Sequence, residues 1–396
     1  MQLNTTDHSN GADTSVATEA TKAQTVVLCM VVRNHRDVVE RSLASLRPLI
    51  DAWFVLDAGS TDGTPEAVRV ALAGLPGAVR AFESNDEGNL RTKALSMARR
   101  MGDYSLLVEP GCGAILDEDF DPRRFRAGLH ADHYEAWVSI DGETAGIRSV
   151  LLASSLQFKF LGVADPMLLA RSGSASPVFT SSFTLAGVAS TEVVDQWGAL
   201  SRAKLIDEAL ALEENEELRR RYRFAAGLAY RDAAYFETSA ERFHERLQMG
   251  WGGDALMRCH LELGHMAGHL GQGPEMRLDH YLRAYDADST RAEGLYYAAR
   301  LCREAGRTPS AYLFARMGLS LPRPERAAYL EPRVYDWALW YEFSIVAWYR
   351  AKYREGLRAC RELLDRSDVP DPERASTEAN LKLYLRAVGA DAAAPR

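Results

Sequence analysis

The apolar residues in the first quarter of the chain form short continuous runs with helical patterns between them. Thr25 to Val32 and Trp53 to Leu56 are unbroken apolar runs of the length expected for strands buried on both faces. Between them, apolar positions at helical spacing favour a helix that Asn34 caps and Pro48 ends. This pattern predicts a parallel sheet, and ligands of such sheets bind where the strands end, which is where Asp57 stands.

Further strands and one more helix follow in the same part of the chain. The expected strands are Val79 to Phe82, Gly102 to Val108, Tyr134 to Ile140 and Ile147 to Leu152. Leu90, Ala94 and Met101 fall on one side of an expected helix. Asp141-Gly142 separates the last two strands as a hairpin-like turn.

The pattern changes near Gly198, beyond which the chain is almost entirely composed of helix-forming residues. Four segments each read as two amphipathic helices joined by a short turn: Tyr222 to Leu247, Ala255 to Tyr285, Arg291 to Leu321 and Trp337 to Leu364. Their spacing of roughly 30 to 45 residues scatters around the 34 of tetratricopeptide repeats. Each pair has an apolar face that only a neighbour can bury, which favours a curved solenoid. An ordinary helical bundle is the alternative.

Composition narrows the classes of protein. The net charge of −8 and isoelectric point near 5.7 argue against a nucleic-acid-binding surface. Five scattered cysteines without a C-x-x-C pair indicate a reduced, cytoplasmic protein. No apolar run approaches the roughly 20 residues of a membrane helix. We expect a disordered tail at 1–23, an α/β domain at 24–198 and helical repeats at 199–390.

Two motifs near the start carry a resemblance to a known family. L-C-M-V-V-R-N followed by V-L-D-A-G-S-T-D-G-T resembles the opening of the inverting family 2 glycosyltransferases, which have a GT-A fold. With helical repeats behind it, the chain is similar to a bacterial subgroup that includes the S-glycosyltransferases of peptide bacteriocins. The resemblance implies an α/β domain with a mostly parallel sheet, followed by an all-α repeat domain. It also implies inverting transfer of a sugar from a nucleotide-sugar donor to a peptide, protein or small-molecule acceptor.

The resemblance assigns the donor site to the ends of the first two strands. It implies that Asp57 contacts the base or ribose of the nucleotide, and the neighbouring candidates are Asn34, Gly59, Ser60 and Asp62. Asp and Gly also favour tight turns, so a simple turn residue is the alternative for Asp57.

The stretch N-L-R-T-K-A-L supplies two candidate cations. The resemblance implies that Arg91 faces the diphosphate of the donor, and Lys93 offers a second positive charge nearby. Arginine binds phosphate with a planar fork and lysine as a point charge. The alternative is that both are solvated charges on the surface of a helix.

The metal-binding part of the family pattern is degenerate. Glu109 stands at the first carboxylate of the family's D-x-D, while Gly111 replaces the second and Ala164 stands where a histidine is usual. A site for Mg²⁺ or Mn²⁺ is therefore expected to be weak, with Glu109 as its ligand, and activity is expected to depend little on metal. Asp165 is the candidate general base, and an ordinary residue before Pro166 is its alternative.

Two functions from different classes remain open. One is the glycosyltransferase, and the other is a degenerate transferase fold that binds or scaffolds a partner through its repeats. In either case the repeats are expected to recognise the acceptor or a partner protein, and a homodimer through them is also expected. His265 and His269 share a helix face but lack an obvious third metal ligand. The aromatic run from Tyr329 to Tyr349 suits a repeat core, or a concave groove for a peptide or glycan.

Overall fold

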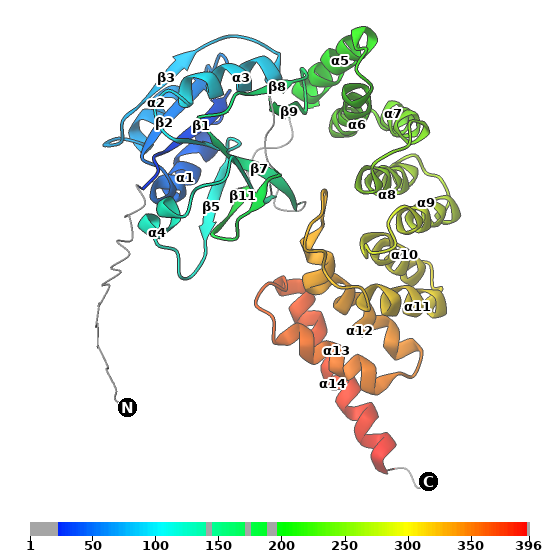
Figure 1. The fold of residues 1–396 in the computed structure, drawn as a ribbon. Helices are drawn as coiled ribbons and strands as arrows, with labels where there is room; N and C mark the ends of the chain where they lie inside the picture. The colour runs from blue at the N-terminus through cyan, green and yellow to red at the C-terminus, as the bar shows by residue number, and fades with distance from the viewer. Residues whose placement is uncertain (1–22, 140–144, 171–175, 188–195, 394–396) are drawn as a thin grey trace, which may run out of the picture.

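The chain folds into a sheet-containing part and an arc of helices that curves around one side of it (Figure 1). The computed structural model describes residues 23–139, 145–170, 176–187 and 196–393. The expected tail and the expected Asp141-Gly142 turn therefore fall outside the described residues, apart from residue 23.

The first half of the sheet is parallel. Its strands and the helices between them are β1 (Val26–Val32), α1 (Arg36–Leu46), β2 (Ala52–Asp57), α2 (Thr64–Ala71), β3 (Gly77–Ala81), α3 (Glu87–Ala98) and β4 (Tyr104–Leu107). β1 is covered on both faces: Val26, Leu28 and Met30 pack with α1, while Val27 and Cys29 pack with α3. This two-sided burial explains the unbroken apolar run in the sequence.

The second half makes the sheet mixed, which corrects the expectation of a mostly parallel sheet. It contains β5 (Cys112–Leu116), α4 (Pro122–Ala127), β6 (His133–Ser139), β7 (Ala145–Ala153), β10 (Val178–Phe179) and β11 (Phe183–Gly187). The strand order is β3-β2-β1-β4-β7-β6-β11-β5, with β10 beside β6. β7 is antiparallel to both β4 and β6, and β5 is antiparallel to β11. Apolar and polar residues alternate along β6, as expected of a strand buried on one face.

A separate hairpin joins the two parts of the chain. β8 (Phe158–Leu161) and β9 (Met167–Ala170) pair with each other and lie against α3. The hairpin turn packs on the other side against the first helices of the arc, where Ala164 and Tyr222 are buried together. It is thus one of the contacts that fix the arc to the sheet part.

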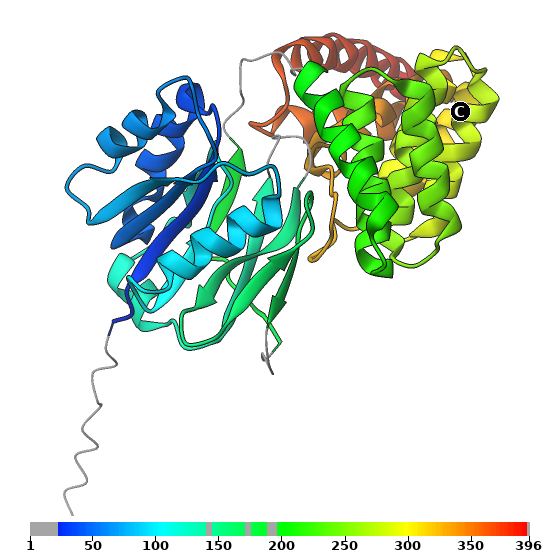
Figure 2. The same cartoon turned by 90° about the horizontal axis from the view of Figure 1, so that it is seen from above.

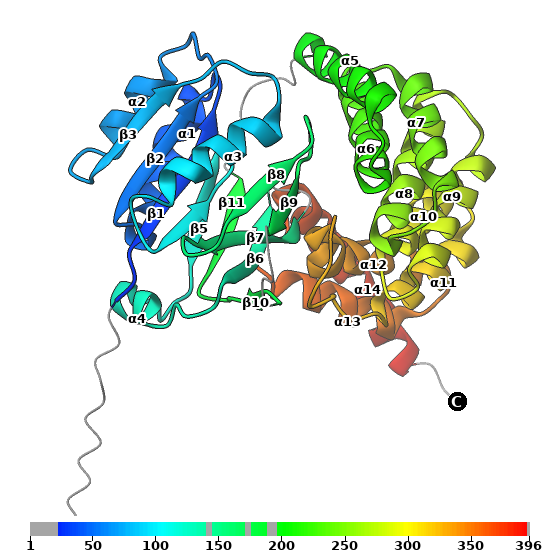
Figure 3. The same cartoon turned by 45° about the horizontal axis from the view of Figure 1, so that its top comes forward.

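The helices confirm the four predicted pairs. The helices of the arc are α5 (Gln196–Leu212), α6 (Glu216–Asp232), α7 (Phe236–Gln248), α8 (Gly253–His269), α9 (Pro274–Ala287), α10 (Glu293–Glu304), α11 (Thr308–Leu319), α12 (Leu339–Tyr349), α13 (Tyr353–Leu364) and α14 (Asp371–Ala393). The predicted pairs are α6–α7, α8–α9, α10–α11 and α12–α13. Glycines let the helices of a pair approach, and a Cβ at Gly264 would lie 2.4 Å from the ring of Tyr281. The pairs α6–α7 to α12–α13 stack into a curved array with α6, α8 and α10 on the side facing the sheet (Figures 1 and 3).

Two general features of the chain are visible in this fold. All five cysteines are buried and none is in a disulfide bond. Burial raises the pKa of the Cys29 thiol to about 12. None of the helices in the described part of the chain is long and apolar enough to span a membrane.

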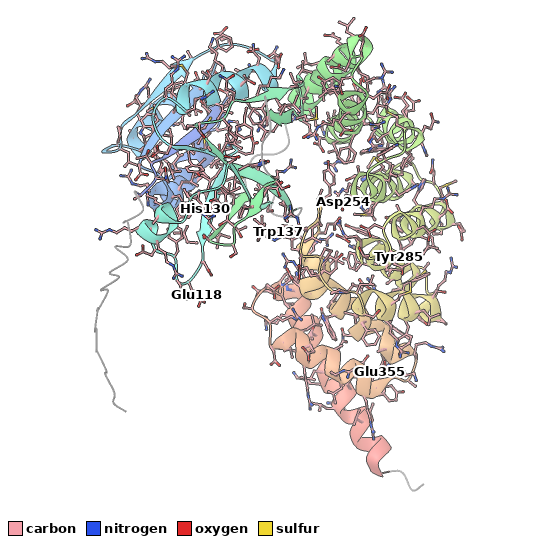
Figure 4. The ribbon with its side chains drawn as sticks, in the orientation of Figure 1. Glu118, His130, Trp137, Asp254, Tyr285 and Glu355 are labelled. Carbon is pink, nitrogen blue, oxygen red and sulfur yellow. The ribbon has the colours of Figure 1, made fainter. Side chains whose placement is uncertain are left out.

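A second connection between the two parts is residues 320–333, which we call the bridging segment. It leaves the arc after α11 and returns to it at the π-helical turn Val334–Ala338. At its far point Leu330 and Ala145 of β7 exchange both backbone hydrogen bonds, at 2.7 Å each. Trp137 of β6 and Asp254 of α8, labelled in Figure 4, contact the segment from opposite sides through Arg323 and the Ala328 amide. Viewed from above, the sheet part and the arc lie side by side (Figure 2).

Candidate functional site

The loops after β1 and β2 hold each other through hydrogen bonds. The Asp57 carboxylate accepts a hydrogen bond from the Ser60 amide at 3.1 Å, as expected of a turn residue. The Ser60 hydroxyl accepts from the Asn34 amide, and the Asn34 side chain accepts from the Thr61 amide at 2.8 Å. Gly59 has a φ of +98°, a conformation that glycine adopts without strain. The predicted donor residues are therefore brought together as one interlocked pair of loops.

The expected cap of the first helix is wrong. His35, not Asn34, occupies the cap position of α1, and Asn34 has a φ of 55° in the left-handed region. The first amides of α1 are instead satisfied by the next loop, because His35 donates to the Thr64 hydroxyl and Arg36 to the Asp62 carboxylate. Burial opposes ionisation of Asp62, but hydrogen bonds from Thr64 and Arg36 outweigh it and lower its pKa.

Arg33 fastens the same loops to the end of β3. Its guanidinium donates to the carbonyls of Ala58 and Ser84 at 2.8 Å each, and to the side chain of Asn85 at 3.0 Å. Sequence reasoning did not single out Arg33, although it directly precedes Asn34 in the motif. Because all three contacts are to protein atoms, its role in this structure is to hold the strand ends together.

Arg91 and Glu109 form a two-pronged ion pair. Nη1 of Arg91 contacts Oε1 of Glu109, and Nη2 lies 3.0 Å from Oε2. Burial opposes the charge of Arg91, but Glu109 and Glu87 outweigh burial and raise its pKa above the ordinary value of arginine. The predicted diphosphate cation and the predicted metal ligand are thus adjacent, and each neutralises the other.

The start of α3 is covered by the β8–β9 turn. The amides of Glu87 and Gly88 donate to the carbonyls of Val163 and Gly162, at 3.1 and 3.0 Å. Lys93 turns away from Arg91, and its Nζ lies 3.3 Å from the centre of the Phe82 ring. The structure therefore does not place Arg91 and Lys93 side by side as the two cations expected for a diphosphate.

Asp165 lies in the β8–β9 turn, at the contact with the arc. Its φ of 44° is unusual for a residue with a side chain, which marks a strained position. Arg221 of α6 contacts it twice, through the Asp165 carbonyl at 2.9 Å and the carboxylate at 3.3 Å. Asp165 also lies close enough to Arg91 for its charge to contribute to the raised pKa of Arg91. Burial, together with the negative charge of Asp165, raises the pKa of Tyr329 in the bridging segment to about 12.

These groups meet at the point where the strand order reverses. β1 lies between β2 and β4, and the chain continues from β1 to β2 on one side and later to β4 on the other. The register places Asp57 opposite Val32, and Glu109 two residues beyond the Leu107–Cys29 pair. Asp57 and Glu109 therefore flank the end of β1, with their backbones about 10 Å apart by the usual strand spacing. Crevices at such reversal points bind ligands in open α/β sheets.

The pocket at this point is small. Its volume is about 30 Å³, and it is lined by Cys29, Met30, Val31, Arg91, Ala94, Leu107, Val108, Glu109 and Phe160. This space suits a water molecule or two. A nucleotide would have to lie over the strand ends or displace the Arg91–Glu109 pair.

A larger pocket, of about 250 Å³, lies on the inner side of the helical arc. It is lined by Arg231, Arg258, Glu262, His265, Met266, His269, Tyr297 and Glu331. These residues come from the first helices of three successive pairs, α6, α8 and α10, and from the bridging segment. We call this hollow the concave pocket.

The walls of the concave pocket are a network of paired charges. Glu262 is almost fully buried and forms ion pairs with Arg231 and Arg258. Glu331 pairs with Arg258 and accepts a hydrogen bond from the Tyr297 hydroxyl, at 2.8 Å each. Arg333 also pairs with Glu331, at 3.2 Å, so three arginines face two carboxylates in this network. Burial lowers the pKa of His265 to about 4, so its ring is neutral near pH 7.

His265 and His269 both line the concave pocket without forming a metal site in this structure. His265 meets the Tyr281 hydroxyl at 3.1 Å, and His269 stacks on Phe236. Across the ranges that the structure describes, no group of three or more His, Cys, Asp or Glu side chains is placed to hold a metal ion. Within the aromatic run, Phe343 is buried in the core of the repeats and Tyr335, Trp337 and Trp340 pack against that core, whereas Trp348 and Tyr349 are exposed.

Comparisons with known proteins give a partial match. No protein-family profile matches the chain. The TPR repeat-containing protein Synpcc7942_0270 of Synechococcus elongatus (strain ATCC 33912 / PCC 7942 / FACHB-805) is 34% identical over 92 residues. The match covers 23% of this chain and 22% of that relative, so the chain spans about a fifth of the relative's length. Together with the four helix pairs, it indicates that the helical region resembles tetratricopeptide repeats.

Solved structures with a partial likeness include three with low overall scores. The MamA protein is 14% identical, with a TM-score of 0.34, over 43% of this chain and 82% of its own. YrrB, described as a TPR protein with an unusual peptide-binding site, is 14% identical, with a TM-score of 0.34, over 46% and 84%. BtubC (BKLC) from P. vanneervenii is 11% identical, with a TM-score of 0.37, over 49% and 83%.

Proposed function

We propose that the helical repeats bind a polypeptide partner in the concave pocket and hold it beside the strand ends of the sheet part. The observation that carries this proposal is the concave pocket itself, built from successive repeat helices and the bridging segment. Repeats of this kind create concave surfaces that suit extended ligands. The likeness to a TPR repeat-containing protein supports the same function.

The pocket offers chemistry suited to a peptide. Arg231 and His269 are its more accessible groups, and Tyr297 adds an aromatic ring with its hydroxyl bonded to Glu331. Polar groups that are already hydrogen-bonded need little rearrangement when a ligand arrives, which lowers the cost of binding. An apolar core patch with a polar rim is absent from the residues that line this hollow, so we expect affinity to come from directional hydrogen bonds.

The fixed placement of the arc supports the second half of the proposal. The arc is tied to the sheet part at the β8–β9 turn, where Tyr222 accepts a hydrogen bond from the Val163 amide at 3.0 Å. It is tied again at the bridging segment, through Leu330 and Ala145. A partner held by the repeats is thereby kept at a defined position relative to Asp165 and the strand ends.

A peptide-display selection on the full chain tests the proposal. Peptides enriched by the wild-type protein should bind at least about tenfold more weakly to Arg231→Ala and His269→Ala, which change the pocket wall. Arg283→Ala is the matched control, because its exposed pair with Asp279 lies on α9 and not in the pocket. Equal binding by all four proteins would show that peptides bind elsewhere, and an empty selection would remove the peptide-binding function.

A second candidate function for the sheet part is glycosyl transfer from a nucleotide sugar. The observation that favours it is the gathering of Asp57, Arg91, Glu109 and Asp165 around the strand-order reversal. An acceptor hydroxyl or thiol would attack the anomeric carbon while Asp165 takes its proton. The leaving diphosphate needs positive charge, which Arg91 supplies once it is released from Glu109. A peptide held in the concave pocket would be a natural acceptor.

Calorimetry separates the transferase from a scaffold without catalysis. The full chain is titrated with UDP, GDP and dTDP sugars, with and without Mn²⁺. Micromolar binding with slow donor hydrolysis supports the transferase, and we expect EDTA to leave most of that turnover. Binding to none of the donors would leave the peptide-binding function alone. Light scattering on the same samples tests the expected homodimer.

A further inference from the structure

Three histidines from three consecutive helices meet on the side of α8 away from the concave pocket. They are His244 of α7, His260 of α8 and His280 of α9. Nδ1 of His260 lies 3.4 Å from Nδ1 of His280. The ring centre of His280 is 5.7 Å from that of His260 and 6.0 Å from that of His244. Residues far apart in sequence thus bring three imidazoles into one cluster.

The cluster is separate from the site described above. His260 is two residues from Arg258 and two from Glu262, which face the concave pocket. Two residues correspond to about 200° around a helix, so His260 lies on the opposite side of α8. His280 is buried and His244 is exposed, which leaves the cluster open to solvent on one side.

The spacing of the two facing nitrogens fits a shared metal ion. Hydrogen bonds from nitrogen usually span about 2.7–3.2 Å, so 3.4 Å is long for a direct bond between the rings. Two nitrogens bound to one tetrahedral Zn²⁺ at about 2.0–2.1 Å each lie about 3.4 Å apart. We propose that His260, His280 and His244 bind a Zn²⁺ ion, with water as the fourth ligand.

Binding requires one local movement. In the described residues, no set of three potential ligands is already in place, so the exposed His244 side chain must turn toward the pair. The nearby Arg283 is held by Asp279 at 2.7 Å, which offsets its repulsion of a cation. The ion would tie α7, α8 and α9 together, and ligand binding to the folded state raises stability.

Zinc titration of the full, tag-free chain tests the proposal, with Co²⁺ as a spectroscopic substitute. We expect one equivalent of Zn²⁺, a raised melting temperature, and a Co²⁺ absorption spectrum typical of tetrahedral nitrogen coordination. His260→Gln and His280→Gln should each weaken binding at least about tenfold. His244→Ala removes an exposed ligand with little risk to folding and should weaken binding too. Circular dichroism confirms that each variant is folded.

The double variant His265→Ala/His269→Ala is the matched comparison, because those histidines lie four apart on the other side of the same helix. Retained zinc binding in this variant supports the proposed cluster. Loss of binding in it, with no change in the His260, His280 and His244 variants, assigns the metal to the concave pocket and overturns the proposal. The absence of any zinc binding by the wild-type chain overturns it as well.

Discussion

Arg91 holds both carboxylate oxygens of Glu109 at the end of β4, with one nitrogen–oxygen distance of 3.0 Å. A planar guanidinium paired with a carboxylate in this way makes a strong and directional contact. The pair lies at the point where the strand order reverses, and both residues line the small pocket there. Any anionic ligand at this point must compete with Glu109 for Arg91.

This competition gives the first prediction. Glu109→Gln removes the competing charge with little change in shape, so binding of UDP or GDP should become at least about tenfold tighter, since a hydrogen bond to a charged group is worth about 1.5–3 kcal/mol. Arg91→Ala should abolish most of that binding. Isothermal titration calorimetry measures both. If Glu109→Gln instead bound the nucleotide more weakly than the wild type, and Mn²⁺ tightened binding only in the wild type, Glu109 would be identified as a metal ligand.

The second prediction separates the two roles of Asp57. If its carboxylate contacts the nucleoside of a donor, Asp57→Ala should weaken nucleotide affinity at least severalfold, because losing such a hydrogen bond costs about 1–3 kcal/mol. Asp57→Asn keeps an acceptor for the Ser60 amide but removes the charge. An asparagine variant with wild-type affinity would show that Asp57 acts through the turn alone.

The third prediction concerns Arg291, whose side chain is fully buried. It pairs with the buried Glu293 and with Asp254, and it donates to the carbonyls of Ala328 and Tyr329 at 3.1 Å each. Arg291→Met leaves Glu293 without its buried partner, so the free energy of unfolding should fall by about 3–5 kcal/mol. Urea denaturation measures this loss.

Proteolysis of the bridging segment is a second measurement on the Arg291→Met variant. Without Arg291, the carbonyls of Ala328 and Tyr329 in the segment lose their donor, so trypsin should cleave after Arg326 much faster. Arg300→Ala is the control, because Arg300 and its partner Glu304 are both about half exposed and such pairs contribute little. Unchanged stability and unchanged cleavage in Arg291→Met would show that the segment is held by other contacts.

The fourth prediction concerns acid. Burial lowers the pKa of His265 from 6.5 to about 4, so the unfolded chain takes up this proton first as the pH falls. Stability from this group is therefore constant above about pH 7 and is lost between about pH 6.5 and pH 4, by at most about 3 kcal/mol. The charged and titratable groups around the ring are Arg231, Arg258, Glu262, Arg277, Tyr281 and Tyr297.

The measurement is urea denaturation of the wild type and of His265→Gln at pH 7.5, 5.5 and 4.5. Other histidines with lowered pKa values, such as His133, remain in both proteins, so the difference between the two isolates His265. The variant should lose less stability on acidification than the wild type. Parallel losses would mean that His265 is protonated in the folded state as readily as in the unfolded one.

Local sequence patterns determined much of this architecture. The continuous apolar run of β1 indicated a strand buried on both faces, and it is covered by α1 on one side and α3 on the other. The four helix pairs also followed from local periodicity, because helical hydrogen bonds and apolar stripes repeat over a few residues. Both signals depend on neighbours in sequence, so a single sequence contains them.

The tertiary structure decided the pairings between distant residues. The sequence marked Arg91 and Glu109 as separate candidates, but only the fold brings them into one ion pair that cancels their charges. Asn34 is a residue type that often caps helices, yet the first amides of α1 donate instead to Asp62 and Thr64, 26 and 29 residues further along the chain. Charges and hydrogen bonds act over a few ångströms in space, whatever the separation along the chain, so their partners depend on how the strands and helices pack.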